Sequence, residues 1–168
     1  KGDDKITEWL KLDSRALVTT EQSSIALDNC LASSGIKVIR CQVGDRYVVE
    51  AMRQGDYILG GEQSGHVVCL NHTTTGDGML SALQILSWVV SQNKSLSELA
   101  QVYQAYPQAF RNIEVREKNN LAEIQEVSQL MDKIKKELGD EGRILVRYSG
   151  TEPLARVMVE GPDQQRAD

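Results

Sequence analysis

Two short apolar runs near the end of the chain flank a ten-residue polar loop, and this pattern limits the local fold more than any other. Ile144–Val146 precede the loop and Val157–Val159 follow it. The loop itself, Arg147–Arg156, is rich in the hydroxyl, glycine and proline residues that favour tight turns. We therefore expect a strand, a tight polar loop and a second strand over this part of the chain.

The same loop carries groups that suit an anion. Arg147 and Arg156 supply two guanidinium groups, and Ser149 and Thr151 supply hydroxyls on either side of Gly150. A phosphate requires several convergent donors and a cation that can bind it through two hydrogen bonds. The sequence thus predicts a phosphate-binding loop, although an ordinary hairpin with arginines on its surface is an open alternative.

Bulk composition limits the partners of the chain. Its 168 residues are 40% hydrophobic and 26% charged, which is typical of a globular protein, and the formal net charge is −5. An acidic chain disfavours a nucleic-acid partner, and no apolar run approaches the ~20 residues that a membrane span needs.

The odd number of cysteines, three, lacks the spacing of a disulfide framework or a zinc site, so we expect a reducing, cytoplasmic location. The chain lacks an initiator Met and looks cut from something longer.

Residues 1–107 alternate between strand-like apolar runs and segments with helical spacing. Such alternation predicts an α/β layer in which strands pair in parallel. The expected strands are residues 16–20, 37–41, 57–59 and 66–70, and the expected helices are residues 24–33, 44–52 and 79–90. The last helix should turn one apolar face inward, made of Met79, Leu80, Leu83, Leu86 and Val90. Ser95 and Glu98 have the spacing of a capping box before a short helix.

The Tyr106–Pro107 pair interrupts this pattern and marks the expected domain boundary. Residues 110–115 then alternate loosely as a strand does. The clearest helix of the chain follows, Leu121–Leu138, and Gly139 should end it. With the two strands around the polar loop, this part predicts a unit of order β-α-β-β.

A second polar loop, Gly60–His66, lies between two of the expected strands. Its glycines let the backbone turn sharply and approach a ligand closely. If the segment is extended, Glu62 and Ser64 face one ligand, and an ionised carboxylate can accept hydrogen bonds from two sugar hydroxyls. A glycine-rich turn whose polar groups satisfy its own backbone is the open alternative.

Four motifs in a fixed order resemble the α-D-phosphohexomutase superfamily. They are Val43–Val48, Gly60–His66, Thr73–Gly78 and Arg147–Gly161. Together they look most like the bacterial phosphoglucosamine mutases, and the resemblance covers nearly the whole chain. It implies the third and fourth of that family's four domains: an α/β sandwich-type domain over residues 1–107 and a small α+β phosphate-binding domain, truncated at its C-terminal end, over residues 108–168.

What the resemblance implies for function is an enzyme that interconverts glucosamine 6-phosphate and glucosamine 1-phosphate. The product leads to UDP-N-acetylglucosamine, a peptidoglycan precursor. In this family a phosphoserine of the first domain donates and recovers the phosphoryl group, and a Mg²⁺ ion in the second domain activates it. Glucosamine 1,6-bisphosphate is the intermediate, and it must turn around, so each phosphate alternates between the reaction centre and a distal anchor.

The resemblance also carries three groups of residues over to this chain. The sugar-binding positions are Glu62, Ser64 and His66. The positions that hold the distal phosphate are Arg147, Ser149, Gly150, Thr151 and Arg156. Two further positions, Asp45 and Arg46, match residues that line the family's cleft.

Two expected parts of such an enzyme are missing from the sequence. The chain contains neither the serine context that the family phosphorylates nor an Asp-x-Asp-x-Asp run for Mg²⁺. We therefore expect no metal and no catalytic residue in this chain, which should bind a hexosamine phosphate weakly and depend on its own N-terminal domains for turnover. The sequence leaves a homodimer open. The alternatives are a phosphomannomutase or phosphoglucomutase, and a sugar-phosphate-binding module without chemistry.

Overall fold

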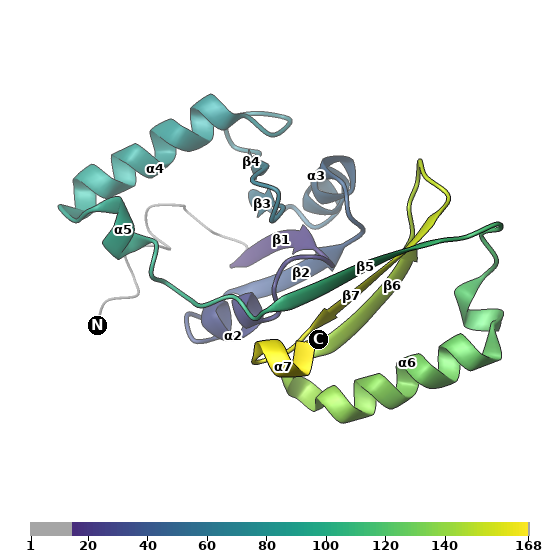
Figure 1. Ribbon diagram of the computed structural model, residues 1–168. Coiled ribbons are helices and arrows are strands. Elements are labelled where there is room, and N and C mark those ends of the chain that lie inside the picture. Colours follow the sequence, from purple (N-terminus) through teal and green to yellow (C-terminus); the bar gives the residue numbers. More distant parts are fainter. Residues whose placement is uncertain (1–14, 168) are drawn as a thin grey trace. The chain divides into compact units, whose positions relative to one another are not determined.

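The computed structural model describes residues 15–167, and the chain divides into two compact units after Gln104. Each unit is built around its own β-sheet (Figure 1). Unit 1 holds a four-stranded sheet and unit 2 holds a three-stranded sheet. No helix within residues 15–167 is long and apolar enough to cross a bilayer.

The sheet of unit 1 has the strand order β2-β1-β3-β4. Its strands are β1 (Ala16–Thr20), β2 (Lys37–Cys41), β3 (Leu59–Gly61) and β4 (Val67–Cys69). The parallel pairing expected from the sequence is confirmed for β1 with β2 and for β1 with β3. It is wrong for β4, which pairs antiparallel with β3. The connection between these two strands is too short for the crossover that a parallel neighbour requires.

The third strand lies two residues later than the sequence pattern predicts. The pattern favoured residues 57–59, whereas Gly60 and Gly61 form most of β3 and pair with Val18 and Thr19. Glycine is needed here because a Cβ atom on Gly60 would lie 2.5 Å from the Met52 sulfur. A search for apolar runs missed this part of the strand because glycine has no apolar side chain. A helix packs directly against the glycine backbone instead.

That helix is α3 (Asp45–Gln54), which packs against β1 and β3 and forms the core of unit 1 with them. The fully buried members of this core are Val18, Val48, Met52 and Val68. The other helices of unit 1 are α2 (Ala26–Ala32), α4 (Gly78–Gln92) and α5 (Leu96–Leu99). The capping box of Ser95 and Glu98 is confirmed at the start of α5.

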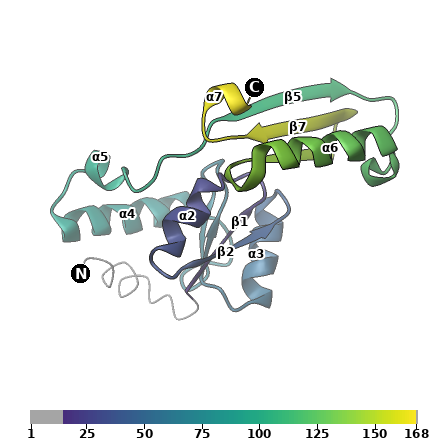
Figure 2. The same cartoon turned by 90° about the horizontal axis from the view of Figure 1, so that it is seen from below.

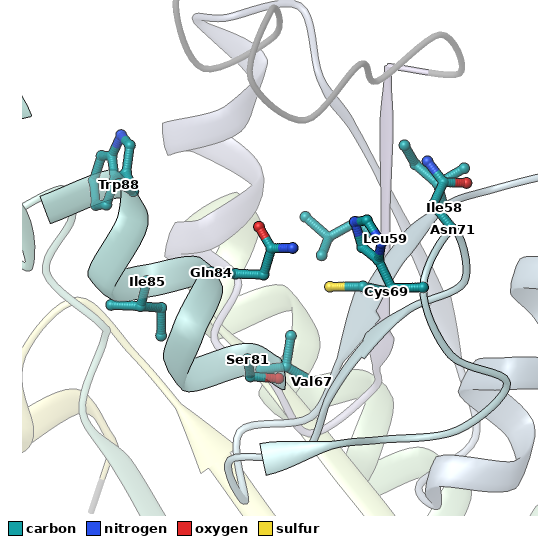
Figure 3. Close-up of a pocket in the computed structure, with 10 residues that line it drawn as sticks. Ile58, Leu59, Val67, Cys69, Asn71, Ser81, Gln84, Ile85 and Trp88 are labelled. Carbon is teal, nitrogen blue, oxygen red and sulfur yellow. The ribbon is translucent and has the colours of Figure 1, made fainter. Parts of the chain in front are cut away.

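The apolar face expected to point inward on α4 is exposed. Met79, Leu83, Leu86 and Val90 are between 57% and 79% accessible to solvent. A different face, which includes Ser81, Gln84, Ile85 and Trp88, lines an apolar hollow of about 280 Å³ beside β3 and β4 (Figure 3). The prediction failed because apolar residues occur on both sides of α4, so their spacing alone does not select one face.

Unit 2 is an antiparallel sheet of order β5-β7-β6. Its strands are β5 (Gln108–Glu114), β6 (Arg143–Tyr148) and β7 (Leu154–Glu160). Helix α6 (Gln125–Leu138) runs along the sheet, and the short helix α7 (Gln164–Ala167) follows β7 (Figure 2). The predicted β-α-β-β order is confirmed.

The expected start of the long helix in unit 2 is wrong. Leu121–Glu123 form a separate 3-10 turn, and α6 begins only at Gln125. Ile124 between them has extended backbone angles, and the Asn120 side chain accepts a hydrogen bond from the Ala122 amide instead. Asparagine competes in this way with helix formation by offering the backbone a local partner.

Candidate functional site

The Gly60–His66 loop forms a closed turn between β3 and β4. The Glu62 amide donates to the His66 carbonyl at 2.9 Å, and the Gly65 amide donates to the Glu62 carbonyl at 3.0 Å. Gly65 makes the turn possible with a φ of 100°, a conformation that favours glycine. The segment is therefore not extended, and the two-residue alternation suggested by the sequence does not place its side chains.

The turn nevertheless brings its three predicted sugar-binding side chains together. His66 Nδ1 lies 3.4 Å from Glu62 Oε2 and 3.3 Å from Ser64 Oγ. The Glu62 side chain is only 10% exposed, whereas the His66 ring is 62% exposed. A nearly buried carboxylate below an open imidazole and a hydroxyl provides acceptors and donors for a polyhydroxy ligand.

Glu62 is held by a residue that the sequence analysis did not assign to the site. Glu62 Oε1 accepts a hydrogen bond of 2.9 Å from the backbone N–H of Gly44. Gly44 has φ 135° and ψ 133°, outside the range of ordinary side-chain residues. The signal in the sequence was the glycine of Val43–Val48, whose role depends on a contact across 18 positions. The glycine loop before α3 therefore fixes the direction of the carboxylate.

Polar groups at the end of β1 support the same turn. Thr19 Oγ1 donates to the Gly61 carbonyl at 2.9 Å and lies 2.6 Å from Ser23 Oγ. Arg40 holds the following loop by donating to the carbonyls of Thr20 and Ser23 at 3.1 and 2.7 Å. These buried and partly buried contacts tie the loop after β1 to the Gly60–His66 turn, which the loop therefore supports.

The proposed cleft residues line a polar hollow of about 560 Å³ in unit 1. Asp45 and Arg46, at the start of α3, lie on one side, and Thr74 and Thr75 lie on the other. In the sequence the two threonines belong to the Thr73–Gly78 motif, which carried the family resemblance, and no role in a site was predicted for them. Their hydroxyls extend the polar lining that a sugar phosphate would meet.

The pKa of the Cys41 thiol responds to the negative charge of Glu62. The pKa of the Cys41 thiol is raised by burial, and further by the negative charges of Glu62 and Glu21. Burial alone raises the pKa of Cys69, which lies in the apolar hollow of Figure 3. Both thiols therefore stay protonated at neutral pH.

In unit 2 the two predicted anchor arginines are direct neighbours across the sheet. Arg147 of β6 and Arg156 of β7 are paired residues of the antiparallel ladder, so their side chains leave the same face. Like charges directly opposite each other destabilise a sheet. An anion that binds between them would relieve this repulsion, which gives the pair a physical reason to bind phosphate.

Inside the loop, Ser149 and Glu152 form a small network. Ser149 is 3% exposed, and its hydroxyl accepts from the Glu152 amide at 3.3 Å. Arg156 Nη2 donates to Glu152 Oε2 at 2.6 Å. Lys118, which sequence reasoning did not single out, donates to the Ser149 carbonyl at 2.6 Å. Gly150 and Thr151 form the exposed tip of the loop.

Within residues 15–167, no group of three or more His, Cys, Asp or Glu side chains is placed to hold a metal ion. The three cysteines are free thiols.

Comparison with known protein families gives two matches in sequence order. Residues 5–106 match the phosphoglucomutase/phosphomannomutase alpha/beta/alpha domain III. Residues 111–168 match the phosphoglucomutase/phosphomannomutase C-terminal domain. The two matches together cover most of the chain.

A curated relative, the phosphoglucosamine mutase of Geobacter metallireducens, is 53% identical over 154 residues. The match covers 92% of this chain and 34% of the relative, so the chain spans about a third of the length of the curated relatives it matches. The corresponding enzyme of Myxococcus xanthus is 49% identical over 93% of this chain and 34% of its own length.

A solved structure shows the same fold at low identity. It is an Aspergillus fumigatus N-acetylphosphoglucosamine mutase in complex with GlcNAc-6P and magnesium, with a TM-score of 0.78 and 16% identity over 98% of this chain and 39% of the other. At this identity the likeness establishes the fold and nothing further.

Proposed function

This chain belongs to the phosphoglucomutase/phosphomannomutase family, and we propose that it is the substrate-recognition part of a phosphoglucosamine mutase. The whole enzyme would interconvert glucosamine 6-phosphate and glucosamine 1-phosphate by way of glucosamine 1,6-bisphosphate. Unit 1 would be the third domain and unit 2 the fourth, with domain limits of residues 1–107 and 108–168. The identity of about half to relatives of that name supports the choice of sugar.

The observation that carries this proposal is the pairing of Arg147 with Arg156 across the sheet. Two guanidiniums on one face of a short hairpin form a cationic seat for the phosphate that is not reacting. Ser149, Gly150 and Thr151 lie in the loop that joins the two strands and would complete the anchor. A phosphate fixed at one end of the sugar holds the other end in position for transfer.

Unit 1 would recognise the sugar. The Glu62 carboxylate, fixed by the Gly44 amide, would accept hydrogen bonds from ring hydroxyls, and Ser64 and His66 would contact the same ligand. Asp45 and Arg46 would line the route by which the ligand enters. A carboxylate close to C2 would also favour the ammonium group of glucosamine over a hydroxyl.

The reacting groups would come from chain outside these residues. We propose that the phosphoserine and the Mg²⁺ ion lie in the N-terminal domains that the relatives contain and this chain does not span. The free state of all three cysteines supports a cytoplasmic location. The proposal is compatible with a homodimer but does not depend on one.

A sister activity on mannose or glucose phosphates is the second candidate, because the matching family models carry both names. The test is turnover by the full-length enzyme with glucosamine 6-phosphate, mannose 6-phosphate and glucose 6-phosphate at equal concentrations. We expect the largest kcat/KM for glucosamine 6-phosphate. A larger kcat/KM for mannose 6-phosphate or glucose 6-phosphate would favour the sister activity. Absence of turnover with all three sugar phosphates would favour a binding module without chemistry.

A further inference from the structure

The arginine at the centre of the proposed phosphate anchor, Arg156 of β7, is already held by a carboxylate of the loop before that strand. Arg156 Nη2 lies 2.6 Å from Glu152 Oε2. The Glu152 side chain is 52% exposed and that of Arg156 is 39% exposed, so a ligand from solvent can reach both. The phosphate proposed above would have to meet this carboxylate before it bound the arginine.

A single carboxylate oxygen takes up two donors of the anchor. Glu152 Oε2 accepts from Arg156 Nη2 at 2.6 Å and from Ser149 Oγ at 3.4 Å. Ser149 and Arg156 are two of the residues that would hold the phosphate. Glu152 Oε2 therefore stands where an oxygen of a bound phosphate would accept the same hydrogen bonds.

Charge makes simultaneous binding of both anions unfavourable. A phosphate monoester carries close to two negative charges at neutral pH and would repel a carboxylate a few ångströms away. In the free protein the same carboxylate offsets the repulsion between Arg147 and its cross-strand neighbour Arg156. We propose that Glu152 is an internal competitor of the phosphate, displaced when the phosphate binds, and this inference rests on the function proposed above.

A buried hydrogen-bond donor of Arg156 supports the displacement of Glu152 by phosphate. Among the described side chains, Arg156 Nε is a buried nitrogen for which no hydrogen-bond acceptor is found. A buried donor without an acceptor destabilises the state that contains it. Release of the guanidinium from Glu152 would let it turn and present Nε together with a terminal nitrogen to the phosphate, the two-bond geometry that arginine prefers.

For a mutase, this competition would allow the phosphate to dissociate from the anchor. The bisphosphate must leave the anchor and return with its other end, so an excessively tight distal site slows the cycle. Glu152 would limit the lifetime of the bound phosphate by competing for the same arginine. It acts through Arg156 and is thus a positioning residue rather than a catalytic one.

The experiment is a titration of the 168-residue chain with glucosamine 6-phosphate, followed by nuclear magnetic resonance of the backbone amides at low salt. Glu152→Gln keeps the size of the side chain and removes its charge. Glu126→Gln, at an exposed position in the first turn of α6, is a matched control that makes the same change of charge in unit 2. We expect Glu152→Gln to bind roughly three- to tenfold more tightly than the parent chain, and the control to bind like the parent.

The outcomes separate the two proposals. Equal or weaker binding by Glu152→Gln, with measurable binding by the parent, would overturn the competitor role and leave the anchor in place. Absence of binding by all three proteins would overturn the proposed function together with this inference. In the full-length enzyme the same substitution should lower KM without raising kcat. A merely structural role for Glu152 would not produce a lower KM.

Discussion

The proposed sugar-binding turn of unit 1 (Gly60–His66) and the segment Arg147–Arg156 of unit 2, here called the arginine loop, hold their charged groups in different ways. Glu62 is nearly buried, and a backbone amide from a distant loop fixes one of its oxygens. Arg156 of β7 is paired, within residues 15–167, with the exposed carboxylate of Glu152, which lies four residues earlier in the loop before that strand. We infer that the first site is formed before its ligand arrives, whereas the second would exchange an internal partner for its ligand.

This difference suits the two tasks. A group that tells one sugar from another needs a fixed direction, because discrimination depends on geometry. A group that must release and capture phosphates at alternate ends of the ligand needs a partner that is easily exchanged. The comparison predicts that substitutions in unit 1 will alter stability and selectivity, whereas those in unit 2 will alter affinity and rate.

The largest effect is expected at the arginine pair. Arg147→Ala in the full-length enzyme should lower kcat/KM by about 10²-fold or more, because a charged contact remote from the reaction holds the reacting end in place. Steady-state kinetics with glucosamine 6-phosphate measures this loss. Unchanged kinetics would show that Arg147 does not contribute to the site, and the comparison between the two units would then have no functional meaning.

The second effect concerns the fixed side of the comparison. Gly44→Ala should lower the free energy of unfolding of unit 1 by about 1–3 kcal/mol, because its φ of 135° strains any residue with a Cβ. Urea unfolding followed by tryptophan fluorescence isolates this unit, since Trp88 belongs to it and the sequence of unit 2 contains no tryptophan. Gly78→Ala is the control, because a Cβ there meets nothing within 4 Å. Equal stability of the two variants would show that the loop before α3 does not constrain the site.

The third effect sharpens the role of Glu62. Glu62→Gln should reduce kcat/KM for the preferred hexosamine phosphate by roughly tenfold, since a hydrogen bond to a charged acceptor is weakened. The affinity for inorganic phosphate should change little, because the phosphate anchor lies in unit 2. An equal loss for every hexose phosphate would contradict the assignment of Glu62 to sugar discrimination.

The smallest effect uses Cys41 as a reporter. The negative charge of Glu62 raises the pKa of Cys41 after burial has done so, and the reactive form of a thiol is the thiolate. Glu62→Gln should therefore lower that pKa and speed alkylation of Cys41 by iodoacetamide at pH 8 by about two- to threefold. Cys69 is the internal control, because burial alone raises its pKa. Equal acceleration of both thiols would point to loosening of unit 1 instead of a charge effect.

The sequence predicted the elements around the arginine loop well because local signals specify them. Apolar runs of strand length flank a cluster of turn-forming residues, and the resulting β6 and β7 strands meet with Arg147 opposite Arg156. The position of β3 was missed because it depends on how closely α3 packs against Gly60. The exposed face of α4 was missed because helical spacing records apolar residues without showing what covers them.

The candidate site shows the same division between local and distant information. Glu62, Ser64 and His66 lie within one turn, so their motif was enough to group them. Gly44 reaches Glu62 from another loop, and Lys118 reaches the Ser149 carbonyl from a segment 31 positions away. Such contacts follow from the packing of separate elements, which no single motif encodes. The Glu152–Arg156 pair lay within the motif, but only its geometry shows that a carboxylate occupies the anchor.

The most direct test of the central claim is to locate the bound phosphate. The chain would be labelled with ¹⁵N and titrated with glucosamine 6-phosphate, and the change in each amide resonance would be recorded. We predict the largest changes at Ser149, Gly150, Thr151 and Arg156, with smaller changes at Glu62 and Ser64. Changes confined to the apolar hollow of Figure 3 around Cys69 and Trp88, with the arginine loop unaffected, would contradict the account.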